Sequence, residues 1–239
     1  MISGMERKVI CALDTQDLDE AIGAVRRLKD HVGAFKIGHG LTLANGLSVI
    51  AQLRDAGARR VFLDLKFHDI PNSVAIAVRE AAKYGVWMMT LHISGGPAMV
   101  SAASAEADLY PADERPLLVG VAVLTSLDQH VLTDHLGVQR ELTDHMAYLA
   151  KLGLECGLDG VVSSPQEIKH LRSVVGNKGI LVCPGIRPEG TEHHDQVRVG
   201  TARQALADGA DYLVMGRTLM AAEDPAAALM RFGLQGTPA

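Results

Sequence analysis

The chain has 239 residues and a formal net charge of −5 at pH 7. This length is typical of a single α/β barrel domain, and the charge argues against a basic surface for nucleic acid or for a membrane. No apolar stretch reaches the roughly 18–20 residues that a bilayer-spanning helix needs. The cysteines Cys11, Cys156 and Cys183 lack the spacing of a metal site. We therefore expect a cytoplasmic protein with reduced thiols that binds neither nucleic acid nor membrane.

Short apolar runs alternate with longer helical patterns along the chain. The predicted strands are Val9–Leu13, Ala34–Ile37, Val61–Leu65, Trp87–Ile93, Leu117–Leu124, Gly160–Val162, Ile180–Val182 and Tyr212–Met215. Strands that alternate with helices in this way form parallel sheets. Eight such units with no obvious linker predict a closed (β/α)8 TIM barrel of the α/β class, a single domain over residues 1–239, rather than an open doubly wound sheet.

Residues typical of helix ends stand between these runs. Candidate N-terminal residues are Asp17, Ser164 with Pro165, Thr201, and Asp224 with Pro225. Candidate C-terminal glycines are Gly57, Gly85, Gly157 and Gly209. Each predicted helix therefore begins after one strand and ends before the next.

The third predicted strand carries charged residues where a buried strand should be apolar. Side chains alternate between the two faces of a strand, so Asp64 and Lys66 share one face while Leu63 and Leu65 share the other. Asp69 follows just beyond the strand end. Desolvating such charges is costly unless they pair. The array could be a solvated salt bridge at a sheet edge, but its apolar flanks favour a functional site.

Other polar residues stand at the carboxyl ends of predicted strands, where barrels of this class carry their active sites. They are Asp14 after the first strand, Lys36 in the second, Thr125 after the fifth, Arg187 after the seventh and Arg217 after the eighth. A solvated surface would not gather polar residues at one end of so many segments. We therefore predict that these residues surround one site together with the charged residues of the third strand.

The segments after the last two predicted strands have the features of a phosphate site. Gly185 and Gly216 permit close approach of the backbone, and Arg187 and Arg217 can each donate two hydrogen bonds to a phosphate. A glycine followed closely by an arginine is, in a single segment, more often a turn with a surface arginine. The loops after the seventh and eighth strands of a barrel, however, commonly bind a phosphate together. The long polar segment 188–200 suits a lid over a bound ligand.

Histidines near predicted strand ends are candidates for metal ligands. His39, His68 and His92 could approach the mouth of the barrel. A metal site needs several convergent histidines or carboxylates, and Lys36 and Lys66 would repel a cation there. We therefore expect no metal.

The segment Asp64–Ser73, with the sequence D-L-K-F-H-D-I-P-N-S, is similar to the signature of the orotidine 5'-phosphate decarboxylase family. Further similar segments are Leu13–Asp14, Phe35–Gly38, Val123–Ser126, Pro184–Pro188, Asp195–Arg198 and Asp211–Arg217. D-x-K-x-x-D alone occurs in a wider group of phosphosugar barrels, but K-I-G at the second strand and P-G-I-R-P at the seventh make the resemblance specific. Ser73 and Thr218 depart from the usual threonine and proline.

The resemblance implies an enzyme of de novo pyrimidine biosynthesis that converts orotidine 5'-phosphate to UMP and CO2 without a metal or an organic cofactor. It implies that Lys66 stabilises the carbanion formed at C6 and then protonates it. Lys36, Asp64 and Asp69 would complete an alternating array of charges, in which the carboxylates keep the Lys66 ammonium protonated.

The resemblance also implies which residues contact the substrate. Asp14 and Lys36 would contact the ribose hydroxyls. Asp64 and Asp69 would face the substrate carboxylate, and Thr125 would lie near the pyrimidine. The expected phosphate contacts are Arg187, Gln196, Gly216 and Arg217.

A homodimer with composite active sites is also implied. In the family the equivalent of Asp69 enters the site of the partner subunit, so the segment Asp69–Ser73 should lie at an interface with two-fold symmetry. Within it, Ile70, Pro71 and Ser73 are expected to contact substrate.

Two other functions remain open. Metal-dependent 3-keto-L-gulonate 6-phosphate decarboxylases and hexulose-phosphate synthases share D-x-K-x-x-D, but they carry a carboxylate at the second strand, where this chain has Lys36. A non-catalytic phosphosugar-binding barrel is the other alternative. Simple binding would not require a lysine between two aspartates, so the charged array favours an enzyme.

Overall fold

Eight parallel strands form a closed barrel in the computed structural model, which describes residues 4–187 and 200–234. The strands are β1 (Val9–Ala12), β2 (Ala34–Ile37), β3 (Val61–Phe67), β4 (Met88–His92), β5 (Leu117–Val121), β6 (Gly160–Val162), β7 (Ile180–Cys183) and β8 (Tyr212–Met215). Each strand pairs with the next along the chain, and β8 pairs with β1. The predicted (β/α)8 barrel is therefore confirmed.

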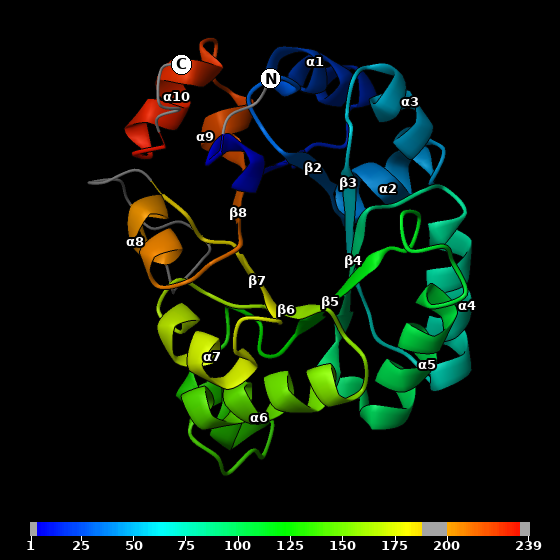
Figure 1. The fold of residues 1–239 in the computed structure, drawn as a ribbon, viewed down its shortest axis with the longest axis vertical. Helices are drawn as coiled ribbons and strands as arrows, with labels where there is room; N and C mark the ends of the chain where they lie inside the picture. The colour runs from blue at the N-terminus through cyan, green and yellow to red at the C-terminus, as the bar shows by residue number, and fades with distance from the viewer. Residues whose placement is uncertain (1–3, 188–199, 235–239) are drawn as a thin grey trace.

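Helices surround the barrel on its outer side (Figure 1). The α-helices are α1 (Leu18–Leu28), α2 (His39–Asn45), α3 (Val49–Asp55), α4 (Pro71–Ala82), α5 (Pro97–Ala107), α6 (Leu142–Glu155), α7 (Ile168–Val175), α8 (Ala202–Ala207), α9 (Arg217–Met220) and α10 (Pro225–Arg231). Other helical segments are the 3-10 turns η1 (Glu6–Lys8) and η2 (Ile93–Gly95) and the π-helical segment η3 (Val131–His135). Among the described residues, no helix has the length and apolar character needed to cross a bilayer.

Most predicted element ends agree with the structure. Asp17, Thr201 and Asp224 cap α1, α8 and α10 through side-chain oxygens that accept backbone N–H groups. The predicted helix start at Ser164 and Pro165 is wrong, because α7 begins at Ile168. There the buried Ser164 hydroxyl donates to the carboxylate of the equally buried Glu167, which holds the intervening residues in a turn.

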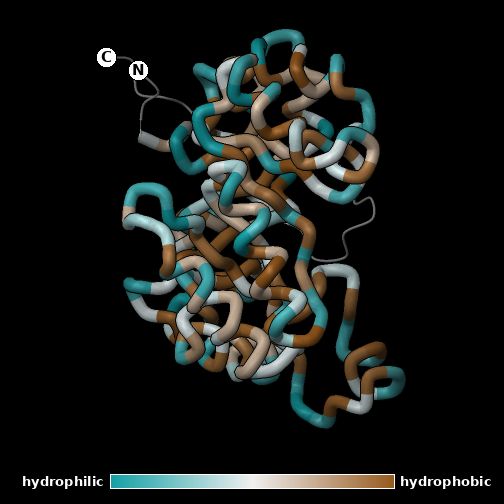
Figure 2. The backbone as a smooth tube through the Cα atoms, turned by 90° about the vertical axis from the view of Figure 1, so that its right-hand side faces the viewer, coloured by the Kyte–Doolittle hydropathy of each residue, from teal (hydrophilic) through white to brown (hydrophobic). Residues whose placement is uncertain are grey.

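The core has two layers, one on each side of the barrel wall. Side chains on the outer face of the strands pack against the helices, and Leu63 and Leu65 belong to this layer as predicted. The barrel interior contains Ile10, Ala12, Ala34, Phe62, Met88, Val119, Val182 and Val214. Figure 2 shows hydrophobic segments running through the middle of the molecule and hydrophilic ones mainly at the outer turns. Because many interior residues are small, space remains at the carboxyl end of the barrel.

Two of the three cysteines lie in the core, and Cys156 is partly buried. Cys11 and Cys183 are buried in β1 and β7, and all three cysteines are free. Burial raises the pKa of the Cys11 thiol to about 12, and burial likewise raises the pKa of Cys183. Both are therefore protonated and unreactive near neutral pH.

Candidate active site

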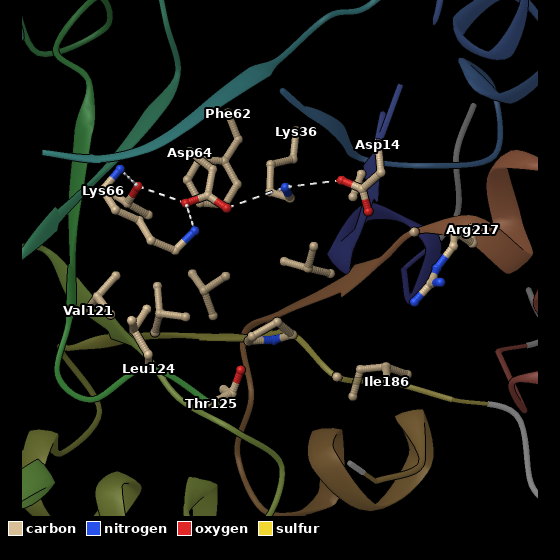
Figure 3. A pocket seen from close by; sticks show the side chains of 18 of the residues that line it. Asp14, Lys36, Phe62, Asp64, Lys66, Val121, Leu124, Thr125, Ile186 and Arg217 are labelled. Carbon is tan, nitrogen blue, oxygen red and sulfur yellow. Dashed lines mark hydrogen bonds and ion pairs between the residues drawn. The ribbon is translucent and has the colours of Figure 1, made fainter. Parts of the chain in front are cut away.

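A cavity of about 400 Å³ opens at the carboxyl end of the barrel (Figure 3). Its charged and polar lining residues are Asp14, Lys36, Asp64, Lys66, Thr90, Thr125, Arg187, Arg217 and Thr218. Its apolar lining includes Phe62, Val121, Val123, Leu124, Val162, Val182, Ile186 and Phe232. In Figure 3 the charged side chains form a row along one wall, and Leu124, Thr125 and Ile186 lie across from it. A flat, partly polar ligand could therefore lie between a charged wall and a largely apolar one.

The charged row runs through four side chains from three neighbouring strand ends. The Lys66 ammonium donates to Asp64 Oδ1 over 2.9 Å. Lys36 Nζ lies 3.3 Å from Asp64 Oδ2 and 3.6 Å from Asp14 Oδ1. Asp64 is therefore held between two lysines, and Lys36 between two carboxylates.

Asp64 is the electrostatic centre of this row. Its side chain is 13% exposed, as is that of Lys36. Burial alone would raise the pKa of Asp64, but the charges of Lys36 and Lys66, with hydrogen bonds from Lys66 and Thr90, outweigh it and hold that pKa below its usual value. The site therefore keeps Asp64 as a carboxylate anion between the two lysine side chains.

The backbone of β3 departs from regular strand geometry at Lys66. Its φ is 51°, and the pairing register with β4 shifts between Leu63 and Phe67. Asp64 and Lys66 do face the same cavity, as predicted, but regular alternation alone does not explain it. The irregular backbone sets where the Lys66 ammonium lies relative to Asp64.

The opposite end of the cavity has the predicted features of a phosphate site. Gly185 and Arg187 follow β7, while Gly216 precedes α9, which begins at Arg217. A Cβ atom at Gly216 would lie 2.9 Å from Asp14 Oδ2, so only glycine fits there without displacing Asp14. The predicted phosphate contact Gln196 and most of the predicted lid lie outside the described residues.

The segment after β3 does not enter the cavity of its own subunit. The Asp69 carboxylate is exposed and accepts the N–H of Ile70 over 2.6 Å. Ile70 is 66% exposed, and Ile70, Pro71 and Ser73 are absent from the lining of the cavity. The predicted contacts of Asp69, Ile70, Pro71 and Ser73 are therefore not made within one chain.

A second, open groove of about 660 Å³ adjoins the charged row. It shares Asp14, Lys36, Asp64 and Lys66 with the cavity, and it extends towards Gln16 and His39. The lysines are thus accessible from two sides, the enclosed cavity and this groove.

A model of the Orotidine 5'-phosphate decarboxylase / HUMPS family matches residues 7–232. The chain belongs to this family. A family member from Pseudoalteromonas translucida, named Orotidine 5'-phosphate decarboxylase, is 46% identical over 224 residues, with 93% of this chain and 94% of the relative covered. A relative of the same name from Moorella thermoacetica is 44% identical, with 92% of this chain and 88% of the relative covered.

Two solved structures also resemble this fold. The structure of Orotidine 5'-phosphate decarboxylase from Lactobacillus acidophilus superposes with a TM-score of 0.81 at 33% identity, covering 95% of this chain and 97% of that one. An uncharacterized conserved protein from Geobacillus kaustophilus has the same TM-score and identity, covering 94% and 98%. The predicted family and the predicted enzyme class, a carboxy-lyase, are confirmed.

Sequence reasoning missed several residues that shape the site of this family member. Thr90 in β4 bonds to both Asp64 and Lys66. Its signal was a polar residue between Met89 and Leu91, in a strand whose only other polar residue is the terminal His92. Phe232, which follows α10, reaches the cavity from the far end of the chain, and no local pattern marks it.

Proposed function

We propose that the protein decarboxylates orotidine 5'-phosphate to UMP in de novo pyrimidine biosynthesis, without a metal or an organic cofactor. The observation that carries this proposal is the row Lys36–Asp64–Lys66 in the wall of a cavity whose other end carries Arg217. The curated relatives described above are named for the same activity. Membership of the family alone does not select this activity, because the family also includes HUMPS proteins.

Lys36 supports this activity over the metal-dependent alternatives. Its ammonium lies 3.6 Å from Asp14 and 3.3 Å from Asp64, in the position where a divalent cation would need to bind both carboxylates. A fixed positive charge there opposes a second cation. A role as a non-catalytic phosphosugar binder is disfavoured because it would not require a buried carboxylate held between two ammonium groups.

In the proposed reaction the substrate carboxylate lies against Asp64. The bond between C6 and the carboxylate carbon breaks, CO2 leaves, and the electron pair stays on C6. The Lys66 ammonium stabilises that negative charge and then transfers a proton to C6, which gives UMP and a neutral amine that regains a proton from water. Departure of CO2 relieves the like-charge contact with Asp64.

The other substrate groups, the ribose, the pyrimidine and the phosphate, would contact residues elsewhere in the cavity. Asp14 and Lys36 would bind the ribose hydroxyls, and Thr125 would lie at the pyrimidine. The proposed phosphate contacts are Arg187, Gln196, Gly216 and Arg217. Binding the phosphate far from C6 holds the pyrimidine against the charged row, so binding energy is used at the reacting carbon.

We further propose a cytoplasmic homodimer in which Asp69 of the partner subunit completes the array. In one chain the exposed Asp69 carboxylate does not line the cavity, while the open groove gives access to Lys36 and Lys66. A further carboxylate in that groove would give Lys66 a second anionic partner besides Asp64. The exposed residues Ile70, Pro71 and Ser73 would then contact substrate or interface across the two-fold axis.

The activity is tested with the purified protein after treatment with EDTA. We expect the orotate absorbance of orotidine 5'-phosphate to disappear as UMP forms. Lack of turnover, or turnover only after Mg²⁺ is restored, would overturn the proposal. Activity on 3-keto-L-gulonate 6-phosphate with Mg²⁺ would support the metal-dependent alternative instead.

The composite site is tested by mixing two inactive variants, Asp69→Ala and Lys66→Ala. Subunit exchange would form hybrid dimers in which one site carries both substitutions and the other carries neither. We expect activity to return, approaching half of the wild-type value per hybrid dimer. Mass spectrometry of the intact complexes monitors exchange, and hybrid dimers without activity would show that Asp69 serves its own subunit.

A further inference from the structure

Thr90 lies in the middle of β4, 1% exposed, directly behind the charged row. Its hydroxyl donates to Asp64 Oδ1 over 2.8 Å and accepts the backbone N–H of Lys66 over 2.9 Å. The same Asp64 oxygen accepts the Lys66 ammonium over 2.9 Å. Thr90, Asp64 and Lys66 thus form a closed ring of hydrogen bonds that includes both the backbone and the side chain of Lys66.

This ring coincides with an unfavourable backbone conformation. Lys66 is the one residue other than glycine with a positive φ in the described part of the chain, and its value of 51° is left-handed. Such a conformation is costly for a residue with a Cβ atom and persists only when its surroundings hold it. The shift in register between β3 and β4 at this point removes regular ladder pairing, and the Thr90 hydroxyl supplies a hydrogen-bond acceptor for the Lys66 N–H.

The donor and acceptor roles of the Thr90 hydroxyl are also defined. A hydroxyl has one proton to donate, and its acceptor side is directed at the Lys66 N–H, so its proton goes to Asp64. That donation helps to keep Asp64 ionised and fixes the carboxylate oxygen that binds the Lys66 ammonium. The Thr90 side chain therefore fixes both the backbone from which the Lys66 side chain extends and the Asp64 carboxylate to which the Lys66 ammonium binds.

We propose that Thr90 is a positioning residue that fixes the Lys66 ammonium for proton transfer, an inference that rests on the proposed decarboxylase function. Thr90 acts through the backbone N–H of Lys66 and through Asp64, and it does not itself exchange a proton with substrate. Its effect therefore belongs to the chemical step rather than to phosphate or ribose binding.

The test compares Thr90→Val, which keeps the shape but removes the hydroxyl, with Thr90→Ser, which keeps the hydroxyl. Thr42→Val is a matched control, because Thr42 in α2 is also buried and its hydroxyl has no hydrogen-bond partner among the described residues. We expect Thr90→Val to lower kcat for orotidine 5'-phosphate by at least about tenfold. Thr90→Ser and Thr42→Val should stay within about threefold of the wild type.

The binding of UMP, measured by calorimetry, separates positioning from general damage. Its affinity should change by less than about threefold in all three variants, because the ribose and phosphate contacts are intact. A crystal structure of Thr90→Val should show Lys66 displaced from its left-handed conformation. If Thr90→Val does not fold, the ratio of kcat between Thr90→Ser and Thr90→Ala isolates the hydroxyl, and the same tenfold or larger ratio is expected.

Three outcomes would overturn the inference in distinguishable ways. Wild-type protein without activity on orotidine 5'-phosphate would remove the proposed function and this role with it. An active wild type with equal kcat in Thr90→Val and Thr42→Val would leave the function standing and show that Thr90 only packs. A parallel loss of UMP affinity and kcat in Thr90→Val would show that Thr90 supports the whole cavity rather than Lys66.

Discussion

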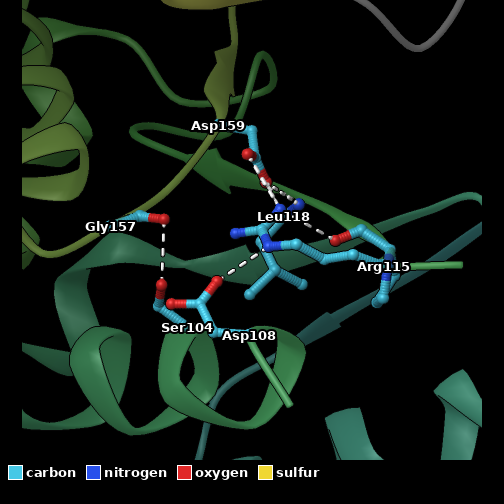
Figure 4. Close-up of polar contacts among 7 residues, drawn as sticks. Ser104, Asp108, Arg115, Leu118, Gly157 and Asp159 are labelled. Carbon is cyan, nitrogen blue, oxygen red and sulfur yellow. Dashed lines mark hydrogen bonds and ion pairs between the residues drawn. The ribbon is translucent and has the colours of Figure 1, made fainter. Parts of the chain in front are cut away.

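The two ends of the barrel both carry ion pairs between strands, but they hold them differently. At the amino end, Arg115 donates to both oxygens of Asp159, each over 2.9 Å, and to Asp108 over 2.8 Å (Figure 4). Asp159 also accepts the backbone N–H of Leu118 over 2.7 Å. The carboxylate just before β6 is thereby bound to β5 and to the segment that leads into it.

The same arrangement recurs two strands further along the barrel. Asp211, just before β8, accepts the N–H of Leu181 in β7 over 2.8 Å and an N–H of Arg172 over 2.5 Å. Arg172 also donates to the carbonyl oxygens of Gly179 and Gly209. At this end, planar guanidinium groups bind several fixed acceptors at once, so the charges are used to join strands.

In the charged row at the carboxyl end the cations are lysines, and they line a cavity. Among the described residues, the Lys66 ammonium contacts one carboxylate, that of Asp64, and keeps donors for a bound molecule. An ammonium can also lose a proton, whereas a guanidinium cannot. Burial of an ion pair therefore does not by itself indicate a function. The type of cation, the number of fixed acceptors and the neighbouring cavity separate a structural pair from a reactive one.

Lys66→Ala should have the largest effect at the carboxyl end. We expect kcat for orotidine 5'-phosphate to fall by about a thousandfold or more, because the variant loses both charge stabilisation and the proton donor. Circular dichroism and the melting temperature should stay near those of the wild type. Lys83→Ala, which removes an exposed lysine of an α4–loop ion pair, is the control. A Lys66→Ala variant that keeps about a tenth of the wild-type kcat would disprove the assigned role.

Arg217→Ala tests whether the part of the cavity that carries Arg217 binds the phosphate of the substrate. Affinity for orotidine 5'-phosphate should weaken by on the order of 2–4 kcal/mol, because a charge-assisted contact is lost. Steady-state kinetics with orotidine, which lacks the phosphate, should hardly change between wild type and variant. Equal losses with both substrates would show that Arg217 acts in some other way.

Arg115→Ala should show the reverse of the pattern expected for Lys66→Ala. The free energy of unfolding in urea should fall by about 1–3 kcal/mol, because Asp159 and Asp108 lose a shared partner, while kcat should be unchanged. Arg59→Ala removes an exposed arginine whose nearest carboxylate, Asp30, is 3.8 Å away, and it should be nearly neutral. A large loss of kcat in stable Arg115→Ala protein would break the distinction between the two ends.

The smallest expected effect is the contribution of Asp64 to the pH dependence of the free energy of unfolding. The folded pKa of Asp64 lies below the usual value, so the unfolded chain binds a proton at Asp64 at a higher pH than the folded chain does. The stabilisation from this carboxylate is therefore complete above the unfolded pKa of about 4 and is lost as the pH falls through the folded pKa. Urea unfolding of the wild type and Asp64→Asn should differ by a constant amount from pH 7 to about 4 and converge below it. A difference that grows on acidification would contradict the direction of this shift.

Local patterns in the sequence were sufficient to predict the barrel and most of the site. Apolar runs in alternation with capped helices are short-range signals, and the ends of β2, β6 and β8 lie where these signals put them. Parallel strands in a closed barrel bring all their carboxyl ends together, so residues far apart in sequence, such as Asp14 and Arg217, had to share one cavity. The prediction for β5 was less accurate, because the apolar residues Val123 and Leu124 line the cavity rather than extend the strand.

Other features of the site were decided only by the tertiary structure, because they depend on contacts between strands. The left-handed backbone of Lys66 has no sequence signal, because lysine does not favour it and the Thr90 hydroxyl of the neighbouring strand accepts its N–H. The fold also separates the aspartates of one motif, since β3 holds Asp64 in the cavity while Asp69 is exposed in the connection between β3 and α4. Sequence alone determined which residue types meet at the mouth of the barrel, because the alternation of strands and helices depends on short-range patterns along the chain. Their distances, their hydrogen-bond partners and the direction of each side chain came from packing between segments distant in the chain.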